Sequence, residues 1–155
     1  MFGITLLALH PKVQEELHKE INSICGDRLP TFADIQHLVY GLCVMYETMR
    51  LYPIIGSLSI TVSGNKDETL LGKYPIPKNA GLGLDLYNLH RNENYWGPTA
   101  NEFNPSRFDN RNSKDVEEKG WYSADGKIKM PVRGAWFGFS EGPRACLGNF
   151  ILFID

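Results

Sequence analysis

Hydrophobic residues recur at helical spacing in residues 11–26. The apolar positions of this segment are Val13, Leu17, Ile21 and Ile24. They fall on one face of a helix, and the residues between them are largely polar. Pro11 suits a first helical turn and Gly26 suits a helix end. The pattern therefore predicts an amphipathic helix between Pro11 and Gly26.

A second helical pattern follows in residues 31–53, with a broader apolar stripe. Its members are Ile35, Leu38, Val39, Leu42, Val44, Met45 and Met49. Thr31 and Asp34 have the spacing of a capping box, and Pro53 ends the helical run. The width of the stripe predicts a helix that is largely buried.

After residue 55 the hydrophobic residues recur at the shorter spacing that is typical of β-strands. Residues 56–63 and 69–77 are typical of short strands around a turn at 64–67. Leu82, Leu84 and Leu86 alternate as in a half-buried strand. Residues 110–131 are polar and predict a solvated meander and hairpin. The pattern as a whole predicts a mainly α chain with a small β-sheet.

Composition narrows the class of protein. The chain has 155 residues, of which 43% are hydrophobic and 22% charged, as in one globular domain spanning residues 1–155. A net charge of −2 argues against a nucleic-acid partner.

The three cysteines suggest no disulfide framework, and we expect Cys25 and Cys43 to be packing residues. The four histidines show no metal-ligand spacing, and we expect them to be structural. We find no membrane-spanning run and no signal peptide.

One motif near the C-terminus carries specific chemistry. It has the pattern F-x-x-G-x-R-x-C-x-G, formed by Phe139, Gly142, Arg144, Cys146 and Gly148. A cysteine in such a loop suits axial thiolate ligation of a haem iron, which favours O–O cleavage. A lone cysteine is more often a small buried hydrophobe. A core cysteine needs neither the glycines nor the arginine, so we favour the ligand interpretation.

Each position in this loop has a physical role. The glycines allow close backbone approach to a flat macrocycle. Arg144 can pair with a carboxylate such as a haem propionate, and Phe139 supplies an apolar wall. If a helix begins at Cys146, its N-terminal N–H groups favour the thiolate form.

A second motif is Glu47-Thr48-Met49-Arg50, or E-x-x-R. Residues three apart share a helix face, so Glu47 and Arg50 can form an ion pair. Such pairs usually lie on solvated helices, but this one belongs to the predicted buried helix and so needs further partners. Arg107, in Phe103-Asn104-Pro105-Ser106-Arg107-Phe108, is a candidate second cation for Glu47.

In this order and combination, the motifs resemble the C-terminal part of a cytochrome P450, which is a haem-thiolate monooxygenase. The wording of the motifs resembles that of eukaryotic members of the family, and in style that of fungal ones. The resemblance covers nearly the whole chain, from the end of the family's I helix to the start of its L helix. It places E-x-x-R on the K helix and adds Arg107 to a Glu-Arg-Arg cluster.

The resemblance also implies a cofactor and partners. These are haem b bound through Cys146, an NADPH-dependent reductase as electron donor, and a small apolar organic substrate. Ile54, Ile55, Gly56 and Ser57 are the candidate substrate-facing positions. The parent enzyme is expected at the endoplasmic reticulum membrane, anchored through a missing N-terminal segment.

Departures from the family leave two alternatives open. Family members are much longer, and Thr5 lies too near His10 to match the oxygen-activating threonine. Residues 1–155 are therefore expected to be a fragment, either a truncated non-catalytic product or an incomplete gene model. The parent could instead be a haem-thiolate isomerase or dehydratase, which needs no reductase.

Overall fold

The computed structural model describes residues 1–61, 66–111, 128, 129, 132, 134–140, 145 and 146. Its longer helices are α1 (Phe2–Leu9), α2 (Pro11–Cys25) and α3 (Val39–Leu51). Short helical turns are η1 (Phe32–His37), α4 (Leu86–Leu89), α5 (Glu93–Trp96) and η2 (Pro105–Arg107). The strands are β1 (Ser57–Thr61), β2 (Glu68–Leu70), β3 (Tyr74–Ile76) and β4 (Gly81–Asp85). The prediction of a mainly helical fold with a small β component is confirmed.

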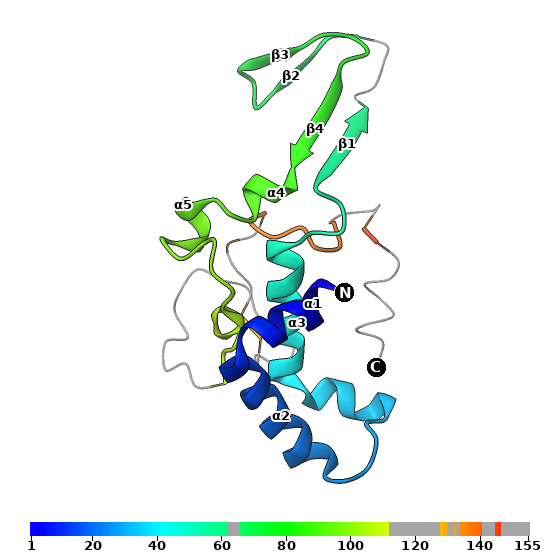
Figure 1. Ribbon diagram of the computed structural model, residues 1–155. Coiled ribbons are helices and arrows are strands. Elements are labelled where there is room, and N and C mark those ends of the chain that lie inside the picture. Colours follow the sequence, from blue (N-terminus) through cyan, green and yellow to red (C-terminus); the bar gives the residue numbers. More distant parts are fainter. Residues whose placement is uncertain (62–65, 112–127, 130–131, 133, 141–144, 147–155) are drawn as a thin grey trace.

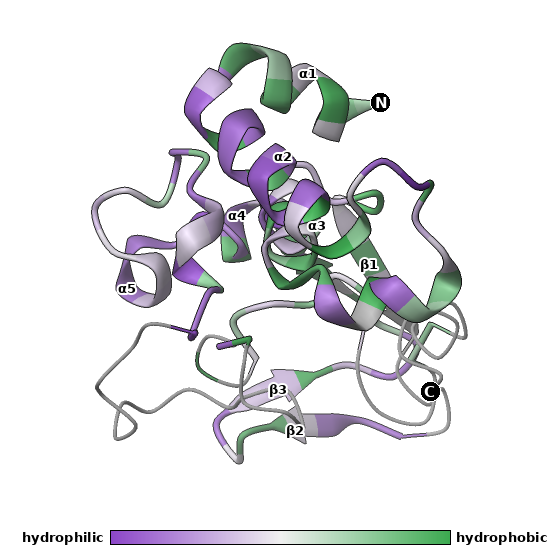
Figure 2. Cartoon of the chain, turned by 90° about the horizontal axis from the view of Figure 1, so that it is seen from below, coloured by the Kyte–Doolittle hydropathy of each residue, from purple (hydrophilic) through white to green (hydrophobic). Residues whose placement is uncertain are grey.

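The first predicted helix is confirmed as α2. Pro11 occupies its first turn, and Gly26 ends it with φ = +58°, a conformation that favours glycine. The preceding helix, α1, is mostly hydrophobic in Figure 2, whereas α2 carries many hydrophilic residues. Val13 and Leu17 of α2 pack against a core cluster that includes Leu6 of α1. Leu6 is therefore buried and Val13 and Leu17 are partly buried in this cluster, whereas Phe2, Ile4 and Leu9 of α1 remain exposed.

The second predicted helix is interrupted, and the expectation of one continuous helix is wrong. The capping box of Thr31 and Asp34 is present, but it begins the 3₁₀ helix η1. Leu38 breaks the run with φ −81° and ψ 62°, and α3 starts at Val39. A carboxylate from α2 stabilises this new start: Glu20 accepts hydrogen bonds from the backbone N–H groups of Tyr40 and Gly41 at 2.8 and 2.9 Å.

The strands pair differently from the prediction. β1 pairs antiparallel with β4, and β2 pairs antiparallel with β3 (Figure 1). Segment 69–77 therefore turns back on itself instead of pairing with 56–63. Leu71 and Gly72 both have positive φ, and Lys73 N–H donates to the Leu70 carbonyl at 3.1 Å, as in a type I′ hairpin turn.

The fourth strand also ends earlier than the leucine alternation predicts. Leu82 and Leu84 lie in β4, whereas Leu86 is the first residue of α4 and is buried. The Asp85 side chain accepts a hydrogen bond from Asn88 N–H at 3.0 Å. This N-cap interaction starts the helical turn at Leu86.

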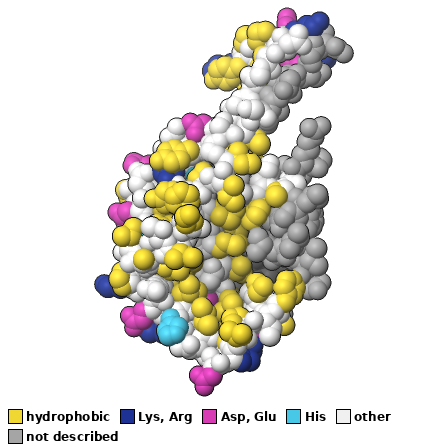
Figure 3. Space-filling view, turned by 45° about the vertical axis from the view of Figure 1, so that its right-hand side comes forward, with side chains coloured by type: hydrophobic (Ala, Val, Ile, Leu, Met, Phe, Trp, Pro, Cys, Tyr) yellow, Lys and Arg dark blue, Asp and Glu magenta, His cyan; other side chains and the backbone are white. Residues whose placement is uncertain are grey.

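The turn at Leu71 allows a prediction about stability. This prediction and the later ones concern the full-length protein, which is the product of the longest open reading frame that encodes residues 1–155. Leu71 is 85% exposed, at the end of the hairpin that projects from the body in Figure 3. A left-handed conformation costs a leucine about 1–2 kcal/mol, and asparagine tolerates it better. We expect Leu71→Asn to raise the free energy of unfolding by roughly 1 kcal/mol in chemical denaturation. Leu70→Asn, at a strand residue of ordinary φ, is the matched control and should not stabilise.

The main core lies between α3 and the segments that follow the sheet. Its fully buried members include Cys43 and Phe108, and Tyr46 is nearly so. Burial raises the pKa of the Cys43 thiol to about 12, so this cysteine is a protonated packing residue. Cys25 is also buried. The predicted packing role of both cysteines agrees with these positions.

The polar region 110–131 is only partly described. An antiparallel bridge joins Asp109 to Ile128, which is buried in the main core. The meander and hairpin expected between them lie outside the described residues.

Candidate functional site

Glu47 lies in α3 with no solvent exposure, between two arginines. Arg50 Nε and Nη2 donate to its two carboxylate oxygens at 2.7 and 2.9 Å. Arg107 Nε donates to Oε1 at 3.1 Å, and Asn104 N–H donates to the same oxygen at 2.9 Å. The structure thus brings together the three charged residues that the sequence singled out. The carboxylate is compensated on both oxygens, as a buried charge requires.

Arg50 also bonds to the chain that follows the sheet. Its Nη1 donates to the carbonyls of His90 and Ala100, both at 2.6 Å, and its Nη2 donates to the Glu102 carbonyl at 3.1 Å. The guanidinium lies 4.8 Å from the centroid of the Trp96 ring. All five donor hydrogens of the guanidinium can be used in this arrangement. Arg50 therefore fastens segment 90–102 to α3.

Arg107 repeats this arrangement from the other side. Its Nη1 donates to the Trp96 carbonyl at 3.3 Å, and its Nη2 donates to the Thr99 carbonyl at 2.7 Å. Asn104 caps η2 through Ser106 N–H at 3.1 Å, which sets the position of Arg107. We call Glu47, Arg50 and Arg107 the charged clamp. The arginines of the clamp donate hydrogen bonds to backbone carbonyls of segment 90–102.

An aromatic segment, Trp136–Phe139, packs against the same core. The Trp136 ring contacts Tyr46 of α3 edge-on, with centroids 5.1 Å apart. Phe139 contacts Trp136 at 6.1 Å, also edge-on. Edge-to-face contacts of this kind contribute beyond area burial alone. They place the predicted apolar wall, Phe139, next to the core.

Cys146 lies beside this wall. Its N–H donates to the Phe139 carbonyl at 2.8 Å, and its side chain is exposed. Ser140, which follows Phe139, has φ = +62°. Gly142, Arg144 and Gly148 lie outside the described residues, as does the helix expected after Cys146.

The chemistry of the donor set fits a haem. Of the cysteines, Cys25 and Cys43 are buried and Cys146 is exposed. The described residues contain no group of three or more His, Cys, Asp or Glu side chains that could hold a metal ion. A single accessible thiol suits a metal whose in-plane ligands come from a macrocycle, because the protein then supplies only the axial ligand.

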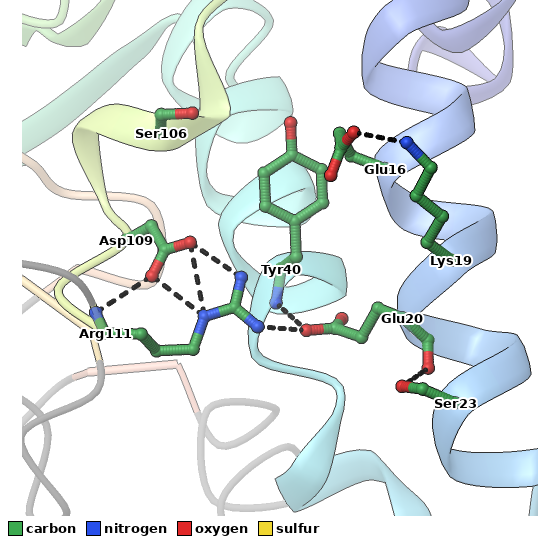
Figure 4. Close-up of a pocket in the computed structure, with 8 residues that line it drawn as sticks. All are labelled: Glu16, Lys19, Glu20, Ser23, Tyr40, Ser106, Asp109 and Arg111. Atoms are coloured by element: carbon green, nitrogen blue, oxygen red, sulfur yellow. Dashed lines mark hydrogen bonds and ion pairs between the residues drawn. The ribbon is translucent and has the colours of Figure 1, made fainter.

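A further charged network lies where α2 meets the start of α3 (Figure 4). Arg111 Nη1 donates to Glu20 at 2.7 Å, and Arg111 Nη2 donates to Asp109 at 2.7 Å. Tyr40, Lys19 and these residues line an open hollow. The carboxylate of Glu20 fills the position beside the helix N–H groups. The network therefore joins segment 109–111 to both helices.

Sequence reasoning missed one connecting residue, His90. It is fully buried, and its Nε2 accepts a hydrogen bond from Phe137 N–H at 2.9 Å. The sequence analysis predicts only that the histidines are structural, and no local spacing indicates a partner 47 residues away. Its position agrees with that general expectation.

Comparisons with known proteins identify the family. The cytochrome P450 family model matches residues 1–151. Secologanin synthase 2 of Catharanthus roseus is 36% identical over 95% of this chain, which covers 25% of that protein. Cytochrome P450 72A397 of Kalopanax septemlobus is 33% identical over 98% of this chain and 26% of its own length. The bifunctional cytochrome P450/NADPH–P450 reductase 2 of Bacillus subtilis is 33% identical over 95% of this chain and 12% of its own length.

The chain belongs to the cytochrome P450 family. It spans about a quarter of the length of the first two curated relatives named above. None of the helices described here is long and apolar enough to cross a membrane.

Proposed function

We propose that this chain is the thiolate-ligand portion of a haem-thiolate monooxygenase, with Cys146 as the axial ligand of haem b. The observation that carries the proposal is the accessible Cys146 side chain in a chain of the cytochrome P450 family. The Cys146 backbone is bonded to Phe139, and Phe139 packs on the core that contains α3. When bound, the haem supplies the iron at which molecular oxygen is activated for insertion into a substrate.

In this proposal the residues of the chain have separate roles. Cys146 donates its thiolate, and Phe139 limits water at the sulfur. Arg144 pairs with a propionate, while Gly142 and Gly148 permit close approach of the loop. The charged clamp holds the segments on which this loop rests.

The proposed substrate is a small apolar organic molecule. Ile54 and Ile55 lie in the link between α3 and β1 and are 87% and 56% exposed. Gly56 and Ser57 are exposed as well. Exposed neighbouring isoleucines are suited to an apolar ligand or to further chain that covers them.

The proposed electron donor is an NADPH-dependent reductase. The support is a relative whose name joins a cytochrome P450 to an NADPH–P450 reductase. Attachment of the enzyme to the endoplasmic reticulum membrane belongs to the same proposal and rests on family resemblance alone.

The test of the ligand uses Cys146→Ser in the full-length protein. A serine oxygen donates far less charge to iron than a thiolate, so we expect the red-shifted ferrous–CO absorbance band to disappear. Cys25→Ser is the control, because a buried packing cysteine has no part in ligation. An unchanged band in Cys146→Ser would contradict the proposal, and so would its loss in a folded, haem-loaded Cys25→Ser variant.

A further inference from the structure

His90 connects the charged clamp to the aromatic segment that precedes Cys146. It is the residue that follows α4, and its side chain has no exposure. Its carbonyl accepts the hydrogen bond from Arg50 Nη1 at 2.6 Å. Its ring nitrogen Nε2 accepts from Phe137 N–H at 2.9 Å. One residue therefore contacts α3 through its backbone and the ligand segment through its side chain.

The contacts continue from His90 to Cys146. The imidazole stacks on the Trp136 ring, with centroids 6.4 Å apart and planes 14° apart. Ser140 N–H donates to the Phe137 carbonyl at 3.2 Å, and Cys146 N–H donates to the Phe139 carbonyl at 2.8 Å. The imidazole thus bonds to Phe137, two residues before the residue whose carbonyl accepts a hydrogen bond from the candidate iron ligand.

The hydrogen bond with Phe137 requires a neutral imidazole. A backbone N–H can only donate, so Nε2 must be unprotonated and the ring proton must lie on Nδ1. Burial lowers the pKa of His90 to about 4; a hydrogen bond with the Arg50 backbone opposes this shift, and the positive charges of Arg50 and Arg91 add to it. Glu47 faces this region too, but it is paired with Arg50. The ring is therefore neutral, with Nε2 as acceptor, at neutral pH.

We propose that His90 is a positioning residue for Cys146: its imidazole Nε2 holds the Phe137 amide and so fixes the segment that presents the thiolate. The proposal rests on the proposed function, because it assumes that Cys146 ligates iron. It also gives the charged clamp a functional consequence, since Arg50 holds the backbone of the same histidine.

The experiment compares two variants of the full-length protein. His90→Gln keeps a neutral side chain whose amide oxygen can accept from Phe137 N–H. His90→Leu keeps apolar volume but leaves that N–H without an acceptor. Two quantities are measured: the thiolate-type fraction of the ferrous–CO spectrum, and hydrogen exchange of the Phe137 amide in protein without haem.

We expect His90→Leu to lose most of the thiolate-type fraction and to speed Phe137 amide exchange at least tenfold. His90→Gln should retain both the spectrum and the protection. Equal loss in the two variants would overturn the proposal, because burial of the ring, and not its acceptor, would then matter. A wild-type spectrum in His90→Leu would overturn it as well.

If His90→Leu does not fold, the pH dependence of the thiolate signature in the wild type and in His90→Gln provides a second test. The pKa of a histidine in the unfolded chain is near its ordinary value of 6.5, whereas burial lowers the pKa of His90 to about 4. The unfolded state therefore binds more protons in this window, and stability falls as the pH is lowered through it. We expect His90→Gln to keep its thiolate signature to lower pH than the wild type. Identical acid profiles would overturn the proposal.

Failure of the proposed function is distinguishable from failure of this one. If Cys146→Ser keeps the red-shifted band, the ligand assignment fails while Phe137 exchange still reports the His90 hydrogen bond. If the band depends on Cys146 but neither His90 variant differs from the wild type, the positioning proposal alone fails.

Discussion

Glu47→Ala in the full-length protein is expected to yield little folded, haem-loaded material. The substitution leaves Arg50, which is fully buried, without its carboxylate partner, and it removes the acceptor of Arg107 and Asn104 N–H. Breaking a buried ion pair by removing one partner typically costs about 3–5 kcal/mol. This is a large share of a typical domain stability of about 5–15 kcal/mol. Chemical denaturation and haem quantification together measure the effect.

One further variant separates the charge of Glu47 from its shape, and a second variant is the control. Glu47→Gln preserves the shape and one acceptor oxygen, so we expect a loss smaller than that of Glu47→Ala. Glu15→Ala is the matched control, because Glu15 forms an exposed pair with Lys19 and such pairs contribute little. Normal expression and haem content in Glu47→Ala would show that the clamp is dispensable.

Lysine cannot replace Arg50 in the charged clamp, because it cannot make the same set of hydrogen bonds. Arg50 reaches two carboxylate oxygens and three backbone carbonyls at once. A lysine ammonium carries three donors and no planar fork, so it would leave some of these carbonyls unpaired. The clamp therefore does more than neutralise charge, because it also provides hydrogen bonds for irregular backbone.

Local signals in the sequence predict α2 and the capping box that precedes α3. Pro11 and Gly26 bound α2, and Thr31 with Asp34 forms a capping box, because each of these interactions involves near neighbours. The E-x-x-R spacing likewise places Glu47 and Arg50 on one helix face. Arg107 was assigned to the same cluster through its motif, since 60 residues separate it from Glu47.

Features that depend on distant parts of the chain were not predictable in this way. The start of α3 depends on Glu20, 20 residues before Tyr40, so the break at Leu38 left no local pattern. The strand pairing was mispredicted because Leu71, an unusual residue for a left-handed turn, gave no turn signal. The contact of His90 with Phe137 is equally non-local.

Glu20 is the second residue whose removal should have a large effect. Its carboxylate is mostly buried and accepts from Tyr40 N–H, Gly41 N–H and Arg111 Nη1. It supplies from another helix the N-terminal cap that α3 lacks in its own sequence. Because α3 carries the charged clamp, its first turn bears on the stability of the whole site.

We expect Glu20→Ala to lower the free energy of unfolding of the full-length protein by about 2–3 kcal/mol, since hydrogen bonds to a charged group contribute about 1.5–3 kcal/mol. Arg111 can keep its bonds to Asp109, so its charge stays compensated (Figure 4). The folded fraction should therefore retain the ferrous–CO band assigned to Cys146. Glu16→Ala, one turn earlier and exposed, is the matched control and should change stability by less than about 0.5 kcal/mol. Equal denaturation midpoints for the two variants would show that α3 starts at Val39 without help from α2.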